Sequence, residues 1–141
     1  MKKGLMIVAV LALGFTACKK DSGDGGTAPK TTSEKIIGSW KGDKVEISLT
    51  VPGVPPQTQS EDISYLNMQF KSDGTAVADS AGLYPEVSTW ALIGDDKIIL
   101  DMDTFDIQTL NDNQFYFGAS GSEDIGGGVM VDFSTTIKLK K

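Results

Sequence analysis

The sequence contains no histidine and no arginine, and it has a single cysteine among its 141 residues. Without histidine, a Ser-His-Asp triad cannot be assembled and zinc loses one of its most common ligands. With one thiol, no disulfide can form within the chain. The fold must therefore be held together by its own core, and we expect the protein not to be an enzyme.

Basic residues are also scarce. The sequence has 13 lysines and 19 acidic residues, which gives a formal net charge of −6. Proteins that bind nucleic acid normally present a basic surface to the phosphates. We therefore expect no nucleic-acid partner.

Carboxylates are the remaining candidates for catalysis or metal binding. Asp101 and Asp103 are two residues apart, which on one face of a strand corresponds to roughly 6 to 7 Å, near the separation of an acid-base pair in glycosidases. Asp101, Asp103 and Asp106 also provide the oxygen ligands that calcium prefers, but they lack the spacing of an EF-hand. Aspartates between two strands normally lie in a solvated turn. We therefore expect no catalytic residues, no metal site and no cofactor.

The N-terminus has the layout of a bacterial lipoprotein signal peptide. Two lysines precede an apolar run that ends at Phe15, and two small residues then lead to Cys18. The run is shorter than the roughly 20 residues that a membrane-spanning helix needs. Cleavage before Cys18 by the ordinary signal peptidase would place Phe15 where a small residue is required. We expect residues 1–17 to be removed and Cys18 to carry lipid that attaches the protein to a membrane.

Residues 18–33 are expected to form the lipidated cysteine and a flexible tether. Residues 19–26 contain no apolar side chain, so burial cannot offset the entropy lost on ordering them. The charged residues Lys19-Lys20-Asp21 directly after the anchor also resemble the surface-export signal of Bacteroidota lipoproteins. We expect an outer-membrane lipoprotein on the periplasmic or the surface-exposed face, with surface display favoured.

Residues 34–141 are expected to form one all-β domain. Thr31 can cap a short helical turn, with Glu34 reaching back to it. Apolar and polar residues then alternate along several segments, as at Val45, Ile47 and Leu49, which is the pattern of half-buried strands. Strands are predicted at 40–51, 63–71, 75–80, 87–93, 97–102, 104–110, 113–119 and 129–139.

Eight consecutive strands favour an eight-stranded antiparallel up-and-down barrel, because closing the sheet removes its exposed edges. A β-sandwich is the alternative. Tight turns at 72–74, 94–96 and 111–112 would share one end of the barrel, while longer connections at 52–62, 81–86 and 120–128 would rim the other. Lysines such as Lys97 are expected toward the closed end, and acidic residues such as Asp106 and Glu123 at or near the rim.

Three motifs resemble those of lipocalins. Gly38-Ser39-Trp40 matches the G-x-W motif of that family. The segments 70–75 (FKSDGT) and 89–100 (TWALIGDDKIIL) are similar to the F-x-x-D-G-T and W-x-L-x-G-D-x-L-x-L runs of lipocalin-like (calycin-type) lipoproteins in Bacteroidota. The resemblance implies that Gly38 and Trp40 close one end of the barrel. It also implies a late basic residue packed over Trp40, for which only Lys138 or Lys140 could serve.

The resemblance further implies a barrel that holds a small apolar ligand, and the lack of Arg and His favours a neutral one. The alternative is a solid barrel that acts as a structural or partner-docking surface protein through its acidic rim loops. An interior void would favour the first function, and a filled interior the second. The residues expected to line the interior are mostly bulky: Ile47, Leu49, Leu66, Met68, Phe70, Trp90, Leu92, Leu100, Phe105, Phe115, Phe117 and Phe133.

Overall fold

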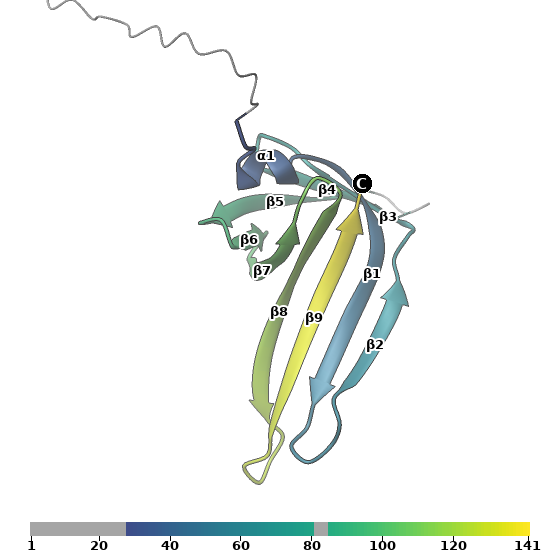
Figure 1. Ribbon diagram of the computed structural model, residues 1–141, viewed down its shortest axis with the longest axis vertical. Coiled ribbons are helices and arrows are strands. Elements are labelled where there is room, and N and C mark those ends of the chain that lie inside the picture. The colour runs from purple at the N-terminus through teal and green to yellow at the C-terminus, as the bar shows by residue number, and fades with distance from the viewer. Residues whose placement is uncertain (1–27, 81–84) are drawn as a thin grey trace, which may run out of the picture.

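The computed structural model describes residues 28–80 and 85–141, so the predictions for the signal peptide, Cys18 and most of the tether lie outside the described residues. One short helix and nine strands make up this part of the chain (Figure 1). They are α1 (Thr32–Ile36), β1 (Gly38–Thr50), β2 (Gln57–Asp62), β3 (Leu66–Phe70), β4 (Thr75–Ser80), β5 (Glu86–Ile93), β6 (Lys97–Leu100), β7 (Asp103–Leu110), β8 (Gln114–Asp124) and β9 (Met130–Lys140).

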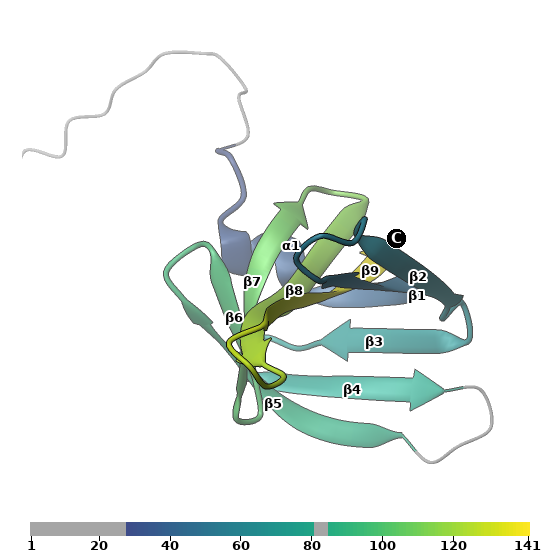
Figure 2. The same cartoon turned by 90° about the horizontal axis from the view of Figure 1, so that it is seen from below.

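Eight of the nine strands close into an antiparallel barrel. β1 pairs with β3 along one edge, the strands from β3 to β9 pair in chain order, and β9 pairs with the other edge of β1. Figure 2 shows this ring of strands from below. The predicted eight-stranded up-and-down barrel is therefore confirmed. Within the described chain, β2 pairs only with β1 and lies outside the closed ring.

The prediction of a loop over residues 52–62 is wrong. Residues 51–56 form a turn in which the Val54 N–H donates to the Val51 carbonyl (3.0 Å), and residues 57–62 form β2. β3 pairs with β1 only over residues 38–41, so the same edge of β1 further along would lack backbone partners. β2 pairs with this free edge and satisfies the hydrogen-bonding groups. Residues 63–65, predicted as strand, instead turn the chain into β3.

Four strands continue beyond the closed ring as an open sheet in the order β2-β1-β9-β8, which runs down from the barrel in Figure 1. We call this sheet the extension; it comprises residues 44–50, 57–62, 119–124 and 130–137. Residues 120–124 were predicted as part of a rim loop, which is wrong. β8 and β9 pair without interruption from Gln114–Lys140 to Asp124–Met130, so these residues continue β8.

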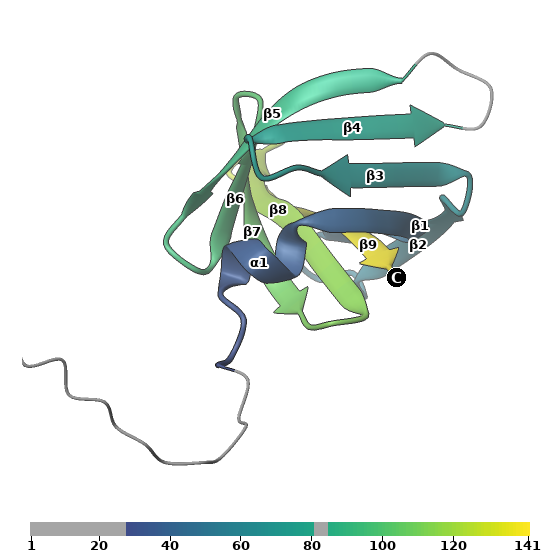
Figure 3. The same cartoon turned by 90° about the horizontal axis from the view of Figure 1, so that it is seen from above.

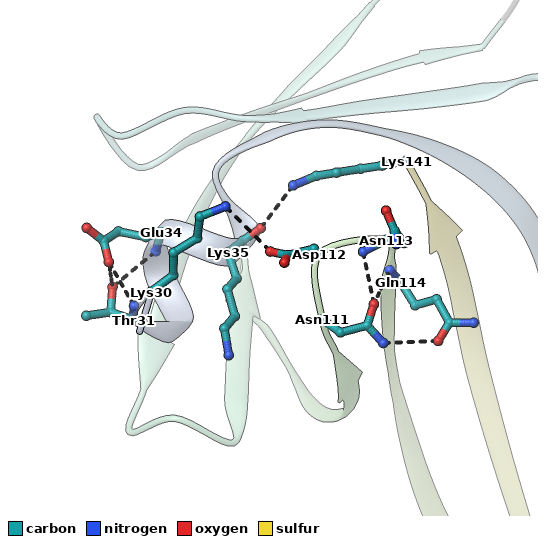
Figure 4. Close-up of polar contacts among 9 residues, drawn as sticks. All are labelled: Lys30, Thr31, Glu34, Lys35, Asn111, Asp112, Asn113, Gln114 and Lys141. Atoms are coloured by element: carbon teal, nitrogen blue, oxygen red, sulfur yellow. Dashed lines mark hydrogen bonds and ion pairs between the residues drawn. The ribbon is translucent and has the colours of Figure 1, made fainter. Parts of the chain in front are cut away.

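α1 lies at the end of the barrel opposite the tip of the extension, beside β7 and β8 (Figure 3). The Glu34 N–H donates to Thr31 Oγ1 (3.3 Å), and the Thr31 N–H donates to the Glu34 carboxylate (2.8 Å). This reciprocal capping confirms the predicted helical turn. Lys30 lies 3.5 Å from Asp112 in the β7–β8 turn, so α1 and that turn meet at one end of the barrel (Figure 4).

Trp40 is the central core residue at this end. Its side chain is 1% exposed, and its indole N–H donates to the carbonyl of Ile36 at the end of α1 (2.7 Å). Its ring lies 5.6 Å from the ring of Phe115, measured between centroids. The ammonium of Lys141 lies 4.4 Å from the Trp40 ring centroid, in the position of a cation–π contact.

The late basic residue over Trp40 is therefore Lys141, and the expectation of Lys138 or Lys140 is wrong. Leu139 points into the core, so its two neighbours along β9 point outward and pair with acidic residues of β1. Lys141 follows the last strand residue and is free to turn back over the ring. Its ammonium also donates to the Lys35 carbonyl (3.5 Å; Figure 4).

We predict that Trp40→Ala lowers the free energy of unfolding by about 3 to 5 kcal/mol. The substitution removes a fully buried aromatic side chain that contacts α1, the Phe115 ring of β8 and the Lys141 ammonium. Denaturant unfolding followed by circular dichroism measures this change. Tyr65→Ala is the matched control, since Tyr65 is 51% exposed, and it should cost less than about 1 kcal/mol. Similar losses in both variants would show that Trp40 does not have this central role.

Candidate functional site

The interior of the closed barrel is packed with large side chains. Phe115 and Phe117 lie 4.8 Å apart between ring centroids, and Phe70 lies 5.7 Å from Trp90 in an edge-to-face arrangement. Of the predicted interior residues, Met68, Phe70, Trp90, Phe115 and Phe117 are buried, and Leu66, Leu92, Leu100 and Phe105 are partly buried against them. Ile36, Ala76, Ile98 and Leu139 are further buried residues that the prediction missed.

Three predicted interior residues are not in the core. Ile47, Leu49 and Phe133 are 50%, 43% and 44% exposed, so their assignment to the barrel interior is wrong. Their side chains do lie on the sheet face that continues the barrel interior. However, they belong to the extension, where the described chain provides no opposite wall.

This surface, the inner face of the extension, follows from the register of the four strands. Side chains alternate between the two faces of a sheet, and cross-strand partners share a face. The inner face therefore comprises Val45, Ile47 and Leu49 of β1; Gln57, Gln59 and Glu61 of β2; Ala119, Gly121 and Glu123 of β8; and Val131, Phe133, Thr135 and Ile137 of β9.

Large apolar side chains occupy the two central strands of the inner face. Leu49 lies opposite Phe133, and Val45 lies opposite Ile137. The Phe133 ring covers Gly121 of the neighbouring strand, where an added Cβ would lie 2.6 Å from the ring. The lack of a side chain at Gly121 thus lets the Phe133 ring lie over β8. The result is an apolar stripe along β1 and β9.

The stripe belongs to a wider group of exposed apolar residues at this end of the molecule. Seven of the eleven large hydrophobic residues that are exposed in the described chain belong to the extension or its two hairpin loops. An exposed apolar concentration of this kind typically marks a binding surface. The seven are Ile47, Leu49, Val54, Ile125, Val129, Met130 and Phe133.

Acidic side chains border the apolar stripe. Glu61 on β2 lies opposite Val45, and Glu123 on β8 lies opposite Val131. Both glutamates are exposed, and neither takes part in an ion pair within residues 28–80 and 85–141. The inner face contains no lysine. Its electrostatic character is therefore acidic at the borders and apolar in the middle.

The opposite face of the extension is polar except for Met130 at its far end. It carries hydroxyl groups on all four strands, and Ser48 and Thr58 are hydrogen-bonded across β1 and β2 (3.3 Å). Ser122 donates to Asp132 across β8 and β9. A shallow hollow of about 280 Å³ on this sheet is lined mainly by such residues. Because only one face is apolar, we take the inner face as the candidate binding site.

A three-residue ion cluster lies on this polar face where the extension leaves the barrel. The ammonium groups of Lys44 and Lys138 each lie 2.7 Å from a carboxylate oxygen of Glu46. The hydrogen bonds donated by Lys138 and Lys44 hold the pKa of Glu46 below its ordinary value of 4.5. The hydrogen bond to Glu46 likewise raises the pKa of Lys44. The cluster ties β1 to β9 at the root of the extension.

The three aspartates considered for catalysis or calcium binding are placed differently, and Asp103 is exposed opposite Leu100 at the start of β7. Asp101 has a positive φ of 55° and accepts a hydrogen bond from the Thr89 N–H (2.8 Å). Asp106 pairs with Lys97, directly opposite it on β6. The expected separation of lysines from these acidic residues is therefore wrong. Within the described chain, no three His, Cys, Asp or Glu residues are grouped in a way that could hold a metal ion.

Comparisons with protein-family models, with curated proteins and with solved structures found no match for this chain. The resemblance to lipocalin-like lipoproteins stays a prediction from the three motifs. In the part of the chain that the structure describes, no helix is long and apolar enough to cross a membrane.

We predict that Glu46→Gln lowers the melting temperature at pH 7, and that this deficit disappears on acidification. A carboxylate with a lowered folded-state pKa stabilises the fold above its unfolded pKa, and this stabilisation is lost as the pH falls through the folded value. The difference from the unaltered chain should therefore shrink below pH 4.5, the ordinary pKa of Glu46. Thermal unfolding at several pH values measures it. Glu123→Gln is the control and should behave like the unaltered chain, whereas a deficit that persists at low pH would point to lost packing.

Proposed function

We propose that the protein is a membrane-anchored, non-catalytic binding module whose recognition surface is the inner face of the extension. The observation that carries this proposal is the exposure of Ile47, Leu49 and Phe133 on a face that continues the core. Fully burying such a side chain contributes about 1.5 to 3 kcal/mol. Because each is already half buried, covering all three would contribute roughly 3 kcal/mol. This binding free energy alone corresponds to weak binding. Polar contacts at the borders of the inner face must therefore add to it.

The packed interior supports docking at the surface more than an enclosed ligand. The rings of Phe70, Trp90, Phe115 and Phe117 contact one another in the middle of the barrel. A filled interior favours the docking function. A small apolar, neutral ligand is the second candidate, because the three exposed side chains could cover one side of such a molecule.

The anchor proposal rests on the lipoprotein-like N-terminus and on where the chain enters the fold. The described chain begins beside α1, while the hairpin loops of the extension lie at the other end of the molecule (Figure 1). Lipid on Cys18 would thus attach the protein from its α1 end. The inner face would then stand away from the membrane, on an outer-membrane lipoprotein displayed at the surface.

We predict that Cys18→Ser leaves an uncleaved precursor or releases the protein from the membrane, because the serine variant lacks the thiol that would carry the lipid. Fractionation of cells that produce the chain, with mass spectrometry of the N-terminus, measures the outcome. Ser22→Ala is the matched control and should be processed normally. A serine variant that is still cleaved and membrane-bound would contradict lipid anchoring through Cys18.

The binding surface is tested by a photoreactive amino acid in place of Leu49, in cells that produce the full chain. We expect a defined cross-linked product, because Leu49 would be covered by the partner. The same group in place of Val87, which is 69% exposed on β5, is the control and should give none. A product of protein size supports docking, and one of small-molecule mass supports the apolar ligand. Absence of any product at Leu49, or equal products at both positions, would contradict the proposed surface.

A further inference from the structure

We propose that the inner face of the extension binds a basic amphipathic helix of a partner protein. This inference rests on the proposed function for the location of the site, and it adds the chemistry and the shape of the occupant. Three observations carry it: the width of the apolar stripe, its length, and the acidic residues at its borders.

The width of the inner face fits one helix. Neighbouring strands lie about 4.8 Å apart, so the two outer strands, β2 and β8, are roughly 14 Å from each other. An α-helix with its side chains is about 10 to 12 Å across. A helix placed over β1 and β9 would cover Leu49 and Phe133, and its flanks would lie above β2 and β8. On the β8 side, Ala119 is small and leaves room for it, while the Phe133 ring covers Gly121 and adds to the apolar surface.

The length of the stripe sets the length of the helix. The apolar stripe begins at Val45, and residues 45–50 of β1 span about 17 Å at 3.4 Å per residue. A helix covers that distance in about 11 residues, or three turns. Such a segment presents apolar side chains at positions i, i+3, i+4 and i+7 along one face.

The acidic borders select the charge of the helix. Glu61 and Glu123 lie on opposite sides of the stripe, and neither makes an ion pair in the described chain. The formal net charge of the whole sequence is −6. Lysine or arginine side chains on both flanks of the helix would form ion pairs with these carboxylates, while an acidic helix would be repelled.

Other occupants fit this face less well. A second copy would bring its own Glu61 and Glu123 against an equally acidic surface. A strand added to the free edge of β2 would lie about two strand spacings, roughly 10 Å, from β1 and would leave Leu49 uncovered. The basic helix satisfies both the apolar and the acidic parts of the inner face.

The test uses the full chain in phosphatidylcholine nanodiscs and a fluorescent 14-residue peptide of leucine and lysine, with leucines at helical spacing. Fluorescence anisotropy should report saturable binding that empty nanodiscs lack. A scrambled peptide of the same composition should bind at least about 10-fold more weakly, because it has no continuous apolar face. A peptide with glutamate in place of lysine should show no binding.

Variants of the protein then locate the site. Leu49→Thr should weaken peptide binding about 5-fold or more, whereas the control Val87→Thr should leave it unchanged. Glu61→Gln combined with Glu123→Gln should also weaken binding and flatten its dependence on salt, because two charge pairs are removed. Glu86→Gln removes an acidic charge outside the inner face, and as the control for charge it should leave peptide binding unchanged. Thermal unfolding of each variant checks that the fold is retained.

Several results would overturn the inference. Equal binding of the scrambled peptide, or binding that Leu49→Thr does not weaken, would show nonspecific attraction to an acidic protein. Dimers that Leu49→Thr abolishes would assign the face to a second copy. Absence of peptide binding, together with a protein-sized cross-link at Leu49 in cells, would reject the basic helix and leave the proposed docking function standing. Absence of both peptide binding and a cross-link at Leu49 would overturn the basic-helix inference and the proposed docking function together.

Discussion

The pairing of β1 with three other strands determines both the closed barrel and the open sheet. One edge of β1 pairs with β9 along most of its length, and this pairing closes the ring. The other edge pairs first with β3 and then, beyond residue 43, with β2. β1 has 13 residues, whereas β3 on this edge has only 5, so β1 continues beyond the end of β3. The extension exists because β1, β8 and β9 continue where β3 to β7 end.

The change of partner along β1 is built from a few local contacts. The register against β9 shifts between Gly42 and Lys44, so Asp43 forms a bulge, and its carbonyl accepts the Ile63 N–H (3.2 Å). A Cβ at Gly42 would lie 2.1 Å from the Ile63 carbonyl oxygen, so only glycine permits this approach. Lys140 pairs with the Asp43 carboxylate from β9. Bulges bend strands and redirect pairing, and here the bulge separates the closed barrel from the open sheet.

Alternation of apolar and polar residues located the barrel strands, because it indicates a strand with one buried and one exposed face. It missed β2, since the segment QTQSED has no apolar residue and pairs with β1 through its backbone and through polar side chains such as Thr58. It also missed the far part of β8, where serine and glycine suggested a loop. Ile47 and Leu49 show a second limit of prediction from alternation. Their spacing indicates which face of β1 they occupy, but whether another wall lies opposite depends on the lengths of distant strands.

The candidate site could be predicted from sequence only in part, for the same reason. The sequence identified Phe133 as an inward residue, whereas its exposure and its position over Gly121 depend on pairing across β8 and β9. An open apolar sheet with a free edge also carries a risk of aggregation. Here the edge strand is wholly polar and ends in Glu61 and Asp62, and Glu123 borders the other side of the inner face. The same carboxylates that disfavour contact between two copies of an acidic chain would favour a basic partner, so solubility and selectivity follow from one arrangement of charge.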